Sequence, residues 1–373
     1  MPDEAPSGWP EGFGASPDER AALILLSSLR GITPRALHRL CWQERSAVGA
    51  LAAIRAGRAG SEGDRAHASA EPDAVLADAA AVGARFVVPC DPEYPVAFLQ
   101  LNDPPAAVFV RGDALQEQER RVAIVGSRRC SALGREVARD LGRRLAAAGV
   151  CVVSGAAHGI DAASHWGALD AGGRTVAVLG SGIDVRYPRS SAGLIDRIAE
   201  AGTVVSEYAP GVPAEPHRFP ARNRLVVGLA SALVVVEGAG RSGSRISVDH
   251  ALDLGREVFA VPGPVTSPLA EVPLAMIREG ATMIRGADDL LQDLGFDVGA
   301  PTQEPPIDLP DHERRAWSAL AGPSLPDVVA RGARLSIPDA VAALIRLELR
   351  GLVRSVGGRY ERTLAGARDA AGV

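Results

Sequence analysis

Short apolar runs alternate with helix-compatible stretches along the middle of this chain. The apolar runs fall at 121–125, 150–154, 175–179, 203–207, 232–237 and 257–261, with a weaker one at 282–284. Helical patterns lie between them, for example at 134–147, 159–171 and 244–255. Continuous apolar runs of this length are typical of strands that are buried on both faces. The alternation therefore predicts an α/β domain with a doubly wound, mostly parallel sheet.

Further elements are expected before this alternation begins. Apolar runs at 85–88 and 107–111 predict two additional strands. Residues 18–55 are rich in Ala and Leu and predict helices, with a turn at Gly31 and a new helix start at Thr33-Pro34. This segment is similar to helix-hairpin-helix or SAM-like modules, in which N–H groups of the glycine turn contact a DNA phosphate. A simple packed pair of helices is the alternative.

The C-terminal part begins after a proline-rich linker at 295–310. Helical patterns at 311–320, 325–330 and 338–349 precede a hairpin that turns at Gly357-Gly358. Three helices and a hairpin predict a winged-helix domain. The expected parts are a disordered tail (1–17), a helical module (18–80), an extended Rossmann-like domain (81–294), the linker and the winged helix (311–365).

Composition restricts the class of protein without naming a ligand. The chain has 373 residues, of which 47% are hydrophobic and 23% charged, as in an ordinary globular protein. Because its formal net charge is −5, any nucleic-acid site must be a local patch. The sequence contains no Lys, so every fixed side-chain cation is the planar guanidinium of Arg, which suits phosphate.

No feature of the sequence predicts a membrane, a metal or a disulfide framework. No apolar run reaches the ~18 residues of a membrane helix, and the polar first 20 residues show no secretory signal. The pair His158 and His165 lacks a third metal ligand. No CxxC pair occurs among the cysteines, which are Cys41, Cys90, Cys130 and Cys151. We therefore expect a cytoplasmic protein.

The first candidate site follows the strand expected at 121–125. Gly126 and Ser127 end this run, and Arg128 and Arg129 come directly after them. In a doubly wound sheet, the loops at the carboxyl ends of the strands bind ligands. A dinucleotide would require small residues close to its pyrophosphate, whereas this turn carries bulky cations. The turn therefore favours contact with a phosphate backbone from outside.

A second candidate is the proline-flanked stretch 216–224, which we interpret as a loop. Its cationic or potentially cationic side chains are His217, Arg218, Arg222 and Arg224. They surround Phe219, and basic residues beside an aromatic ring are typical of single-stranded nucleic-acid sites. In the alternative interpretation, Phe219 packs onto the core and the last two arginines pair with acids. The candidates for these acids are Glu207 and Glu237.

Two catalytic or cofactor motifs are incomplete. Ser154, His158 and Asp161 supply the residue types of a hydrolytic triad, but the G-x-S-x-G spacing of a nucleophile elbow is missing. Residues 238–243 match G-x-G-x-x-G between a strand and a helix. However, they follow the fifth strand, and the acid expected ~20 residues later is replaced by Val261-Pro-Gly-Pro264. We interpret them as an anion-binding helix N-terminus.

Taken in order, these motifs resemble the DprA/Smf family of bacterial DNA-processing proteins. The matching segments are Val125-Gly-Ser-Arg128, Ser154-Gly-x-Ala-x-Gly-Ile-Asp161, Ala177-Val-Leu-Gly-x-Gly182 with Tyr187-Pro188, Phe219-Pro-x-Arg-Asn-Arg224, and Glu237 with Ser242-Gly-Ser244. They cover roughly residues 94–291, and the two flanking modules match common family architecture. The chain departs from the family pattern at 246–248 and at 268–277, where an expected Asn is missing.

The resemblance implies a binding protein rather than an enzyme. Family members hold incoming single-stranded DNA during natural transformation and load a RecA-type recombinase onto it. They act without a cofactor and generally as dimers through the Rossmann-like domain. A single-strand-binding protein and double-stranded DNA both remain open as partners of the winged helix. The implied DNA contacts are Gly126, Ser127, Arg128, Phe219, Arg222 and Asn223, with the turn at Ser242, Gly243 and Ser244 bordering the pocket.

Two other classes of function fit parts of the sequence. Nucleotide phosphoribohydrolases of the lysine-decarboxylase-like class have a similar Rossmann-like core. Such an enzyme would need a catalytic acid beside its glycine loop, and Glu237 is the candidate. A regulator of transcription would rely on the winged helix, whose helix at 338–349 is a poor groove reader. Its charged residues are Asp339, Arg346 and Glu348.

Overall fold

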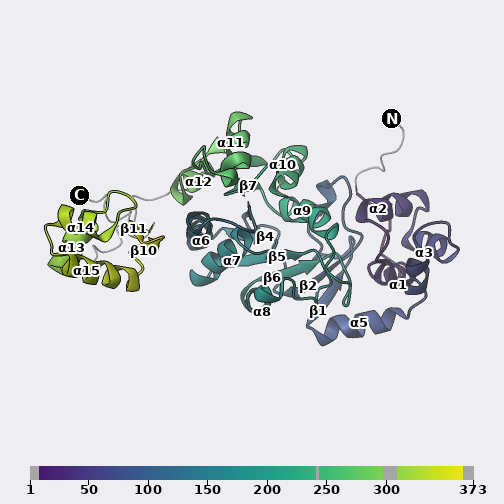
Figure 1. Cartoon of the computed structure of the whole chain (residues 1–373). Helices are drawn as coiled ribbons and strands as arrows, with labels where there is room; N and C mark the ends of the chain where they lie inside the picture. Colours follow the sequence, from purple (N-terminus) through teal and green to yellow (C-terminus); the bar gives the residue numbers. More distant parts are fainter. Residues whose placement is uncertain (1–7, 241–242, 297–308, 364–373) are drawn as a thin grey trace. The chain divides into compact units, whose positions relative to one another are not determined.

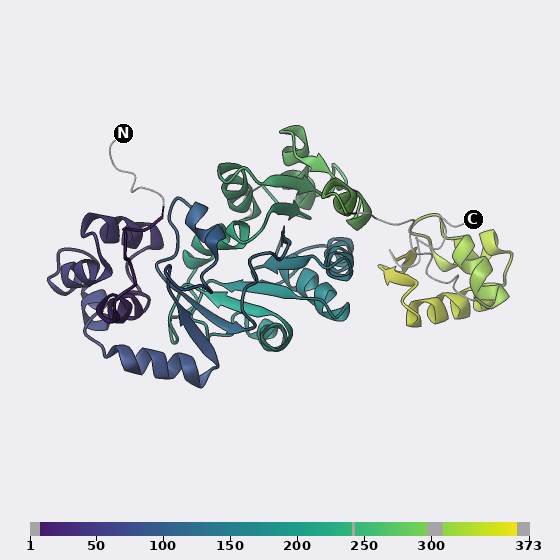
Figure 2. The same cartoon turned by 180° about the vertical axis from the view of Figure 1, so that it is seen from behind.

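The structure is a computed structural model, and it describes residues 8–240, 243–296 and 309–363. The chain divides into two units, residues 1–296 and 297–373, which we describe separately. Figures 1 and 2 show the elements of both units from opposite sides. Among the described residues, no helix has the length and apolar character that crossing a membrane requires.

The first unit is built on a nine-stranded sheet with the order β1-β2-β6-β5-β4-β3-β7-β8-β9. The strands are β1 (Ala84–Val87), β2 (Val108–Gly112), β3 (Arg121–Val125), β4 (Cys151–Ser154), β5 (Thr175–Leu179), β6 (Thr203–Ser206), β7 (Ala232–Val235), β8 (Glu257–Ala260) and β9 (Thr282–Met283). Neighbouring strands are parallel throughout the run β6-β5-β4-β3-β7-β8-β9. At the other edge, β2 is antiparallel to both of its neighbours, β1 and β6. The mostly parallel α/β sheet predicted from the sequence is confirmed.

The strand order reverses at β3. From there the chain builds outward through β4, β5 and β6, then returns to place β7 on the other side of β3. Val122 of β3 lies between Val152 of β4 and Ala232 of β7. In doubly wound sheets, the crevice outside the carboxyl ends of the strands at such a reversal is where ligands bind. The topology therefore places the predicted ligand site between the loops that follow β3 and β7.

Helices cover both faces of this sheet. They are α6 (Ala132–Ala147), α7 (Ile160–Asp170), α8 (Ala192–Ala201), α9 (Arg218–Gly228), α10 (Ser244–Asp253), α11 (Glu271–Arg278) and α12 (Ala287–Asp293), with short 3-10 turns η1 (Val96–Gln100), η2 (Arg189–Ser191) and η3 (Pro268–Ala270). On β5, Val178 packs with Leu225 of α9, whereas its neighbour Leu179 packs with Ile195 of α8. Successive residues of one strand are thus buried on opposite faces, which explains the continuous apolar runs.

Between residue 8 and the first strand, the structure has five helices. They are α1 (Pro17–Leu26), α2 (Pro34–Gln43), α3 (Ala47–Arg55), α4 (Glu62–His67) and α5 (Pro72–Ala81). Ser16, Thr33 and Ser46 cap the first three by accepting a backbone N–H with their hydroxyl oxygens. Leu23, Ile54 and their apolar neighbours form a separate core for this module.

The expectation of a disordered tail at 1–17 is wrong for residues 8–17, which the structure describes. Phe13 is buried, and its ring stacks on Trp9 with 4.3 Å between the ring centroids. The indole of Trp42 on α2 donates a hydrogen bond to the carbonyl of Gly8 (3.1 Å). These contacts of Phe13, Trp9 and Trp42 hold the segment from residue 8 onward against the helical module. Residues 1–7 lie outside the described residues.

The glycine turn at Gly31 contacts a carboxylate of the protein itself. The backbone N–H groups of Arg30 and Gly31 donate to Oδ1 of Asp64 (2.9 and 2.8 Å), whose other oxygen accepts from Ser61 (2.8 Å). Asp64 is buried on α4. The expectation that this turn contacts a DNA phosphate is therefore corrected, because an internal anion already occupies its donors.

The described part of the second unit, residues 309–363, contains three helices and one hairpin. They are α13 (Asp311–Ser318), α14 (Pro326–Ala333), α15 (Ile337–Leu349), β10 (Val353–Val356) and β11 (Arg359–Arg362). The hairpin turns at Gly357 and Gly358, whose φ angles of 58° and 77° are those of a type I′ turn. These elements match the expected ones, and the assignment to the winged-helix class stays a prediction. Residues 297–308 of the expected linker lie outside the described residues.

Candidate nucleic-acid interface

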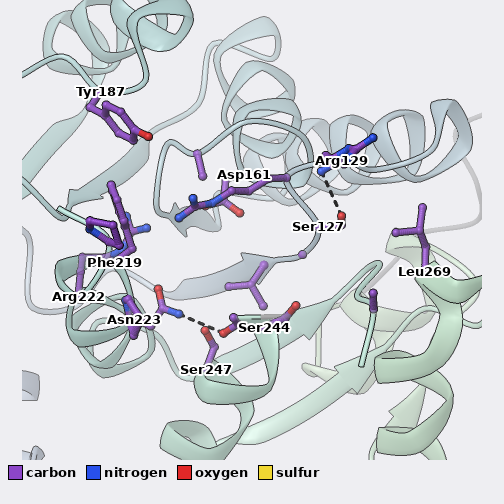
Figure 3. Close-up of a pocket in the computed structure, with 18 residues that line it drawn as sticks. Ser127, Arg129, Asp161, Tyr187, Phe219, Arg222, Asn223, Ser244, Ser247 and Leu269 are labelled. Atoms are coloured by element: carbon purple, nitrogen blue, oxygen red, sulfur yellow. Dashed lines mark hydrogen bonds between the residues drawn. The ribbon is translucent and has the colours of Figure 1, made fainter. Parts of the chain in front are cut away.

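A cleft of about 820 Å³ opens at the carboxyl ends of β3 and β7, where the strand order reverses (Figure 3). It is built from loops and helix starts between Val125 and Leu269, which are 144 positions apart in the sequence. Most of the predicted site residues line it. They are Gly126, Ser127, Arg128, Arg129, Phe219, Arg222, Asn223, Gly243 and Ser244. Ser242 lies outside the described residues.

The turn after β3 is held by its backbone, which leaves its arginine side chains exposed. Ser127 N–H donates to the carbonyl of Glu237 after β7 (2.8 Å), and its own carbonyl accepts from Ile160 N–H (3.3 Å). A Cβ on Gly126 would approach Ile160 to 2.6 Å, so only glycine fits between these segments. Arg128 and Arg129 follow this fixed turn and are both exposed at the cleft.

Phe219 lies in the first turn of α9 rather than in a loop, which corrects the interpretation of residues 216–224. Its ring is half-buried and stacks on Tyr187, with 5.3 Å between the centroids and 29° between the planes. The guanidinium carbon of Arg128 lies 4.8 Å from the centroid of the same ring. The structure thus brings together Arg128 and Phe219, as predicted, and adds Tyr187, which was not among the predicted site residues.

Arg222 lies in the floor of the cleft and contacts the protein itself. Its guanidinium donates to the carbonyls of Gly155 (2.7 Å) and Val178, which belong to the carboxyl ends of β4 and β5. Burial lowers the pKa of Arg222 to about 10, although the carboxylate of Asp161 acts in the opposite direction. Arg222 therefore fixes two strand ends beneath the cleft that it also lines, and its direct contact with DNA stays a prediction.

Two other predicted cations of this stretch are buried away from the cleft, which corrects their assignment. Arg224 pairs with Glu207 (2.7 Å) and with Asp103 (3.1 Å). Arg218 donates to the carbonyls of Arg30 (3.0 Å) and Pro213. Because α9 turns every 3.6 residues, neighbouring side chains point in different directions. The alternative in which an arginine pairs with Glu207 is confirmed for Arg224.

His217 is also outside the cleft. Its side chain is exposed, and its Nδ1 lies 3.6 Å from a carboxylate oxygen of Glu215. It does not line the cleft, so its prediction as a DNA contact gains no support from this geometry.

The opposite wall of the cleft is the start of α10. Asn223 on α9 donates a hydrogen bond from its amide to the carbonyl of Gly243 (3.2 Å), directly before Ser244 begins the helix (Figure 3). Ser247, one turn further, also lines the cleft. A helix N-terminus presents unpaired N–H groups and a partial positive charge, which favour an anion. The glycine turn after β7 thus borders the cleft, as the motif predicted.

The three residues of the possible hydrolytic triad are not assembled. Ser154 is buried and donates its hydroxyl hydrogen to the carbonyl of Ile124 (2.6 Å). His158 is exposed and contacts Ser190 (3.0 Å). His165, the other histidine of this region, is fully buried, and burial lowers its pKa to about 3. Neither imidazole is therefore placed to activate Ser154.

Glu237, the candidate acid of the enzyme hypothesis, caps a helix instead of facing the cleft. Its two carboxylate oxygens accept hydrogen bonds from the backbone N–H of Ser131 (2.8 Å) and from its hydroxyl (2.6 Å). Ser131 in turn caps α6. A Cβ on Gly134 would approach this carboxylate to 2.3 Å, so the acid is enclosed by the helix start. This arrangement does not favour the phosphoribohydrolase.

This chain is similar to known proteins over most of its length. Residues 85–295 match the family described as DNA recombination-mediator protein A. The putative DNA processing protein DprA of Mycobacterium tuberculosis strain H37Rv is 39% identical over 310 residues, covering 78% of this chain and 79% of that one. The protein Smf of Escherichia coli K12 is 37% identical, covering 74% of this chain and 77% of that one.

Solved structures show the same similarity. The structure of DNA processing protein A from Streptococcus pneumoniae has a TM-score of 0.59 and 30% identity, covering 74% of this chain and 98% of that one. The protein from Helicobacter pylori, studied for its single-stranded DNA binding mode, has a TM-score of 0.52 and 27% identity, covering 56% of this chain and 95% of that one. This chain therefore belongs to the DNA recombination-mediator protein A family, the DprA/Smf proteins that its motifs indicate.

Proposed function

We propose that this chain binds single-stranded DNA in the cleft and acts in the cytoplasm as a recombination mediator of natural transformation. In this role it protects incoming DNA and loads a RecA-type recombinase onto it. Family membership and the Helicobacter pylori relative support the proposal. The proposal rests on one observation: the exposed residues Arg128 and Arg129 line the same cleft as the half-buried Phe219.

The chemistry of this cleft suits a single strand better than a duplex. An aromatic side chain stacks on a base only where the base is unstacked from its neighbours, as in single-stranded DNA. Guanidinium groups and the N-terminus of α10 provide sequence-independent contacts with phosphate. Full-length protein should bind oligothymidylate more tightly than a duplex of the same length in fluorescence anisotropy, with affinity falling as salt increases. Equal or tighter binding of the duplex would contradict the proposal.

Arg128→Ala is expected to weaken binding to all sequences alike. The loss of one phosphate contact should reduce the slope of log affinity against log salt by roughly 0.7 for a single strand. Salt titration by anisotropy measures this slope directly. Arg197→Ala is the matched control, because Arg197 is an exposed arginine on α8 that pairs with Glu200 (2.5 Å) and does not line the cleft. A folded Arg128→Ala protein with the wild-type slope would refute the phosphate contact.

We propose the domain division of the sequence analysis, except that residues 8–17 belong to the helical module. We also propose that the second unit is dispensable for single-strand binding. The cleft is lined entirely by residues 125–269. A chain that ends after Phe296 should therefore keep most of the affinity of the full chain in the same assay. A loss beyond about tenfold, or about 1.4 kcal/mol of binding free energy, would show that the second unit takes part. The partner of that unit, single-strand-binding protein or duplex DNA, can be tested by adding each to the full and the shortened chain.

We also propose a homodimer through the Rossmann-like unit. The apolar side chains of Val272 and Met276 on α11 are buried in the unit's own core, so they are not available for a contact between two copies. Leu252 and Met283 are exposed near the β9 edge, beside a groove of about 260 Å³, and support a contact there. Light scattering on the full chain should show a dimer at micromolar concentration, and a monomer would contradict this.

We propose a binding protein rather than an enzyme. The hydrogen bonds that Glu237 accepts from Ser131 support this, because they hold the candidate acid of the rival enzyme at the start of α6 and outside the cleft. Incubation of the protein with nucleoside monophosphates should release no free base. Release that depends on Glu237 would favour the phosphoribohydrolase instead.

A further inference from the structure

Tyr187 lies beside Phe219 in the cleft, although the two residues come from different segments. Tyr187 follows β5, and Phe219 is the second residue of α9. Tyr187 is 44% exposed, and it lines the same cleft (Figure 3). The two rings are nearly parallel, at 29°, with 5.3 Å between their centroids. Because the rings stack on each other, each keeps one outer face on which a base can stack.

The guanidinium of Arg128 covers the ring of Phe219 in this structure, at 4.8 Å from its centroid. A cation–π contact at an exposed site is worth less than the stacking of a nucleobase on an aromatic side chain. A base is therefore able to replace the guanidinium on Phe219. The displaced Arg128 remains on the fixed turn after β3, where it is free to pair with the phosphate next to that base.

We propose that Tyr187 is a second base-stacking residue, so that Tyr187 and Phe219 form a platform for two neighbouring bases of one DNA strand. This inference rests on the proposed function. It adds to the proposed binding site a residue that lies outside both the basic stretch 216–224 and the glycine turns. One base stacks on the exposed face of Tyr187, and the next takes the place of Arg128 on Phe219. Stacking is tolerant of sequence, which fits a protein that accepts any incoming strand.

The ring of Tyr187, rather than its hydroxyl group, is expected to carry the contact. Tyr187→Phe should therefore bind oligothymidylate as the wild type does, whereas Tyr187→Leu should bind roughly tenfold more weakly or worse. The salt slope should not change, because stacking releases no counterions. Trp166→Leu is the matched control, since Trp166 is 37% exposed on α7 and does not line the cleft. Wild-type affinity in Tyr187→Leu would overturn the platform.

A tyrosine that only supports Phe219 would also weaken binding when removed, so contact must be tested in the wild-type protein. Oligothymidylate that carries 5-iododeoxyuridine cross-links under ultraviolet light to aromatic side chains in contact with it. Tryptic cleavage places the two rings on separate fragments, 187–189 and 219–222. Cross-links on both fragments are expected. Cross-links on 219–222 alone would refute the stacking role of Tyr187 and leave the proposed function standing, whereas wild-type protein that binds no single strand would refute both.

Discussion

Phe219→Ala should weaken binding of single-stranded DNA by roughly ten- to a hundredfold, because a stacked base contributes ~1–3 kcal/mol. The salt slope should stay close to that of the wild type, in contrast to Arg128→Ala, because the ring carries no charge. Anisotropy with oligothymidylate at several salt concentrations measures both quantities. The geometry supports the expectation, since the ring is half-buried at the cleft and contacts Tyr187 and Arg128 rather than an apolar core.

Phe219→Trp separates stacking from a purely structural role. If the ring stacks on a base, tryptophan should bind about as well as phenylalanine, because any aromatic face can serve. If the ring only fastens the start of α9, Phe219→Ala should lower the melting temperature and tryptophan should be poorly tolerated. Melting curves of both variants, measured beside their affinities, decide between these patterns. An unstable alanine variant whose folded fraction binds normally would show that the site is wrongly assigned.

The strands and the position of the cleft followed from local pattern. Strands buried on both faces produce continuous apolar runs, and the glycine turns mark where those strands end. The helix α9 was missed because Pro216 and Pro220 indicate a loop. However, Pro220 is only the third residue of α9, where backbone N–H groups have no partner within the helix in any case. Proline there costs no hydrogen bond, so the helix forms around it.

The partners of the arginines on α9 could not be predicted from the local sequence pattern. Arg222 contacts a carbonyl 67 positions away at Gly155, and Arg224 pairs with Asp103, 121 positions away. Such contacts depend on which strand ends lie next to α9, which only the completed sheet determines. Tyr187 left a weak signal, an aromatic residue shortly after the carboxyl end of a predicted strand. Its proximity to Phe219 required the packing of α9 beside β5.

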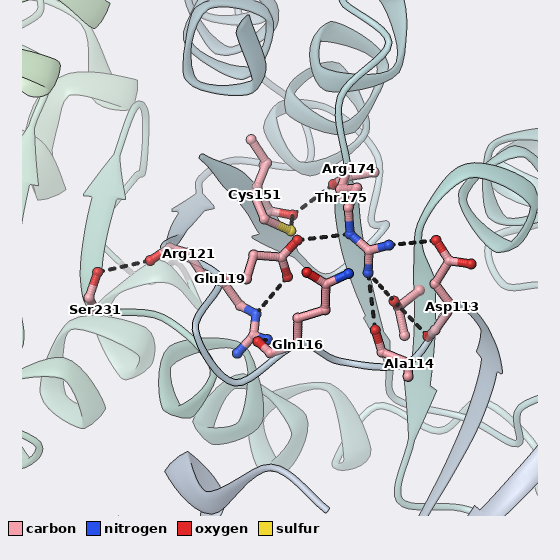
Figure 4. Close-up of polar contacts among 11 residues, drawn as sticks. Asp113, Ala114, Gln116, Glu119, Arg121, Cys151, Arg174, Thr175 and Ser231 are labelled. Carbon is pink, nitrogen blue, oxygen red and sulfur yellow. Dashed lines mark hydrogen bonds and ion pairs between the residues drawn. The ribbon is translucent and has the colours of Figure 1, made fainter. Parts of the chain in front are cut away.

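A separate polar cluster lies at the amino ends of the central strands (Figure 4). The carboxylate of Glu119 is 8% exposed and accepts hydrogen bonds from Nε of Arg121 (3.1 Å) and Nε of Arg174 (2.8 Å). Arg121 begins β3 and Arg174 directly precedes β5. Arg174 also pairs with Asp113 at 2.5 Å. The cluster therefore ties the segment before β3 to the central strands.

Glu119→Ala is expected to reduce the free energy of unfolding by about 3–5 kcal/mol, because the buried guanidinium of Arg121 would lose its carboxylate partner. Urea unfolding of the full chain, followed by circular dichroism, measures the change. Glu200→Ala is the control: its ion pair with Arg197 is exposed, and its loss should cost less than about 1 kcal/mol.

Folded Glu119→Ala protein should bind single-stranded DNA like the wild type, because Arg121 starts β3 whereas the cleft opens beyond Val125 at its other end. A loss of stability no larger than that of Glu200→Ala would contradict the role of the carboxylate. If the Glu119→Ala protein were as stable as the wild type but bound DNA more weakly, the cluster at the amino ends of the strands would influence the cleft at their carboxyl ends. Phe219 and Glu119 are thus expected to affect different observables, binding for the ring at one end of the strands and stability for the carboxylate at the other.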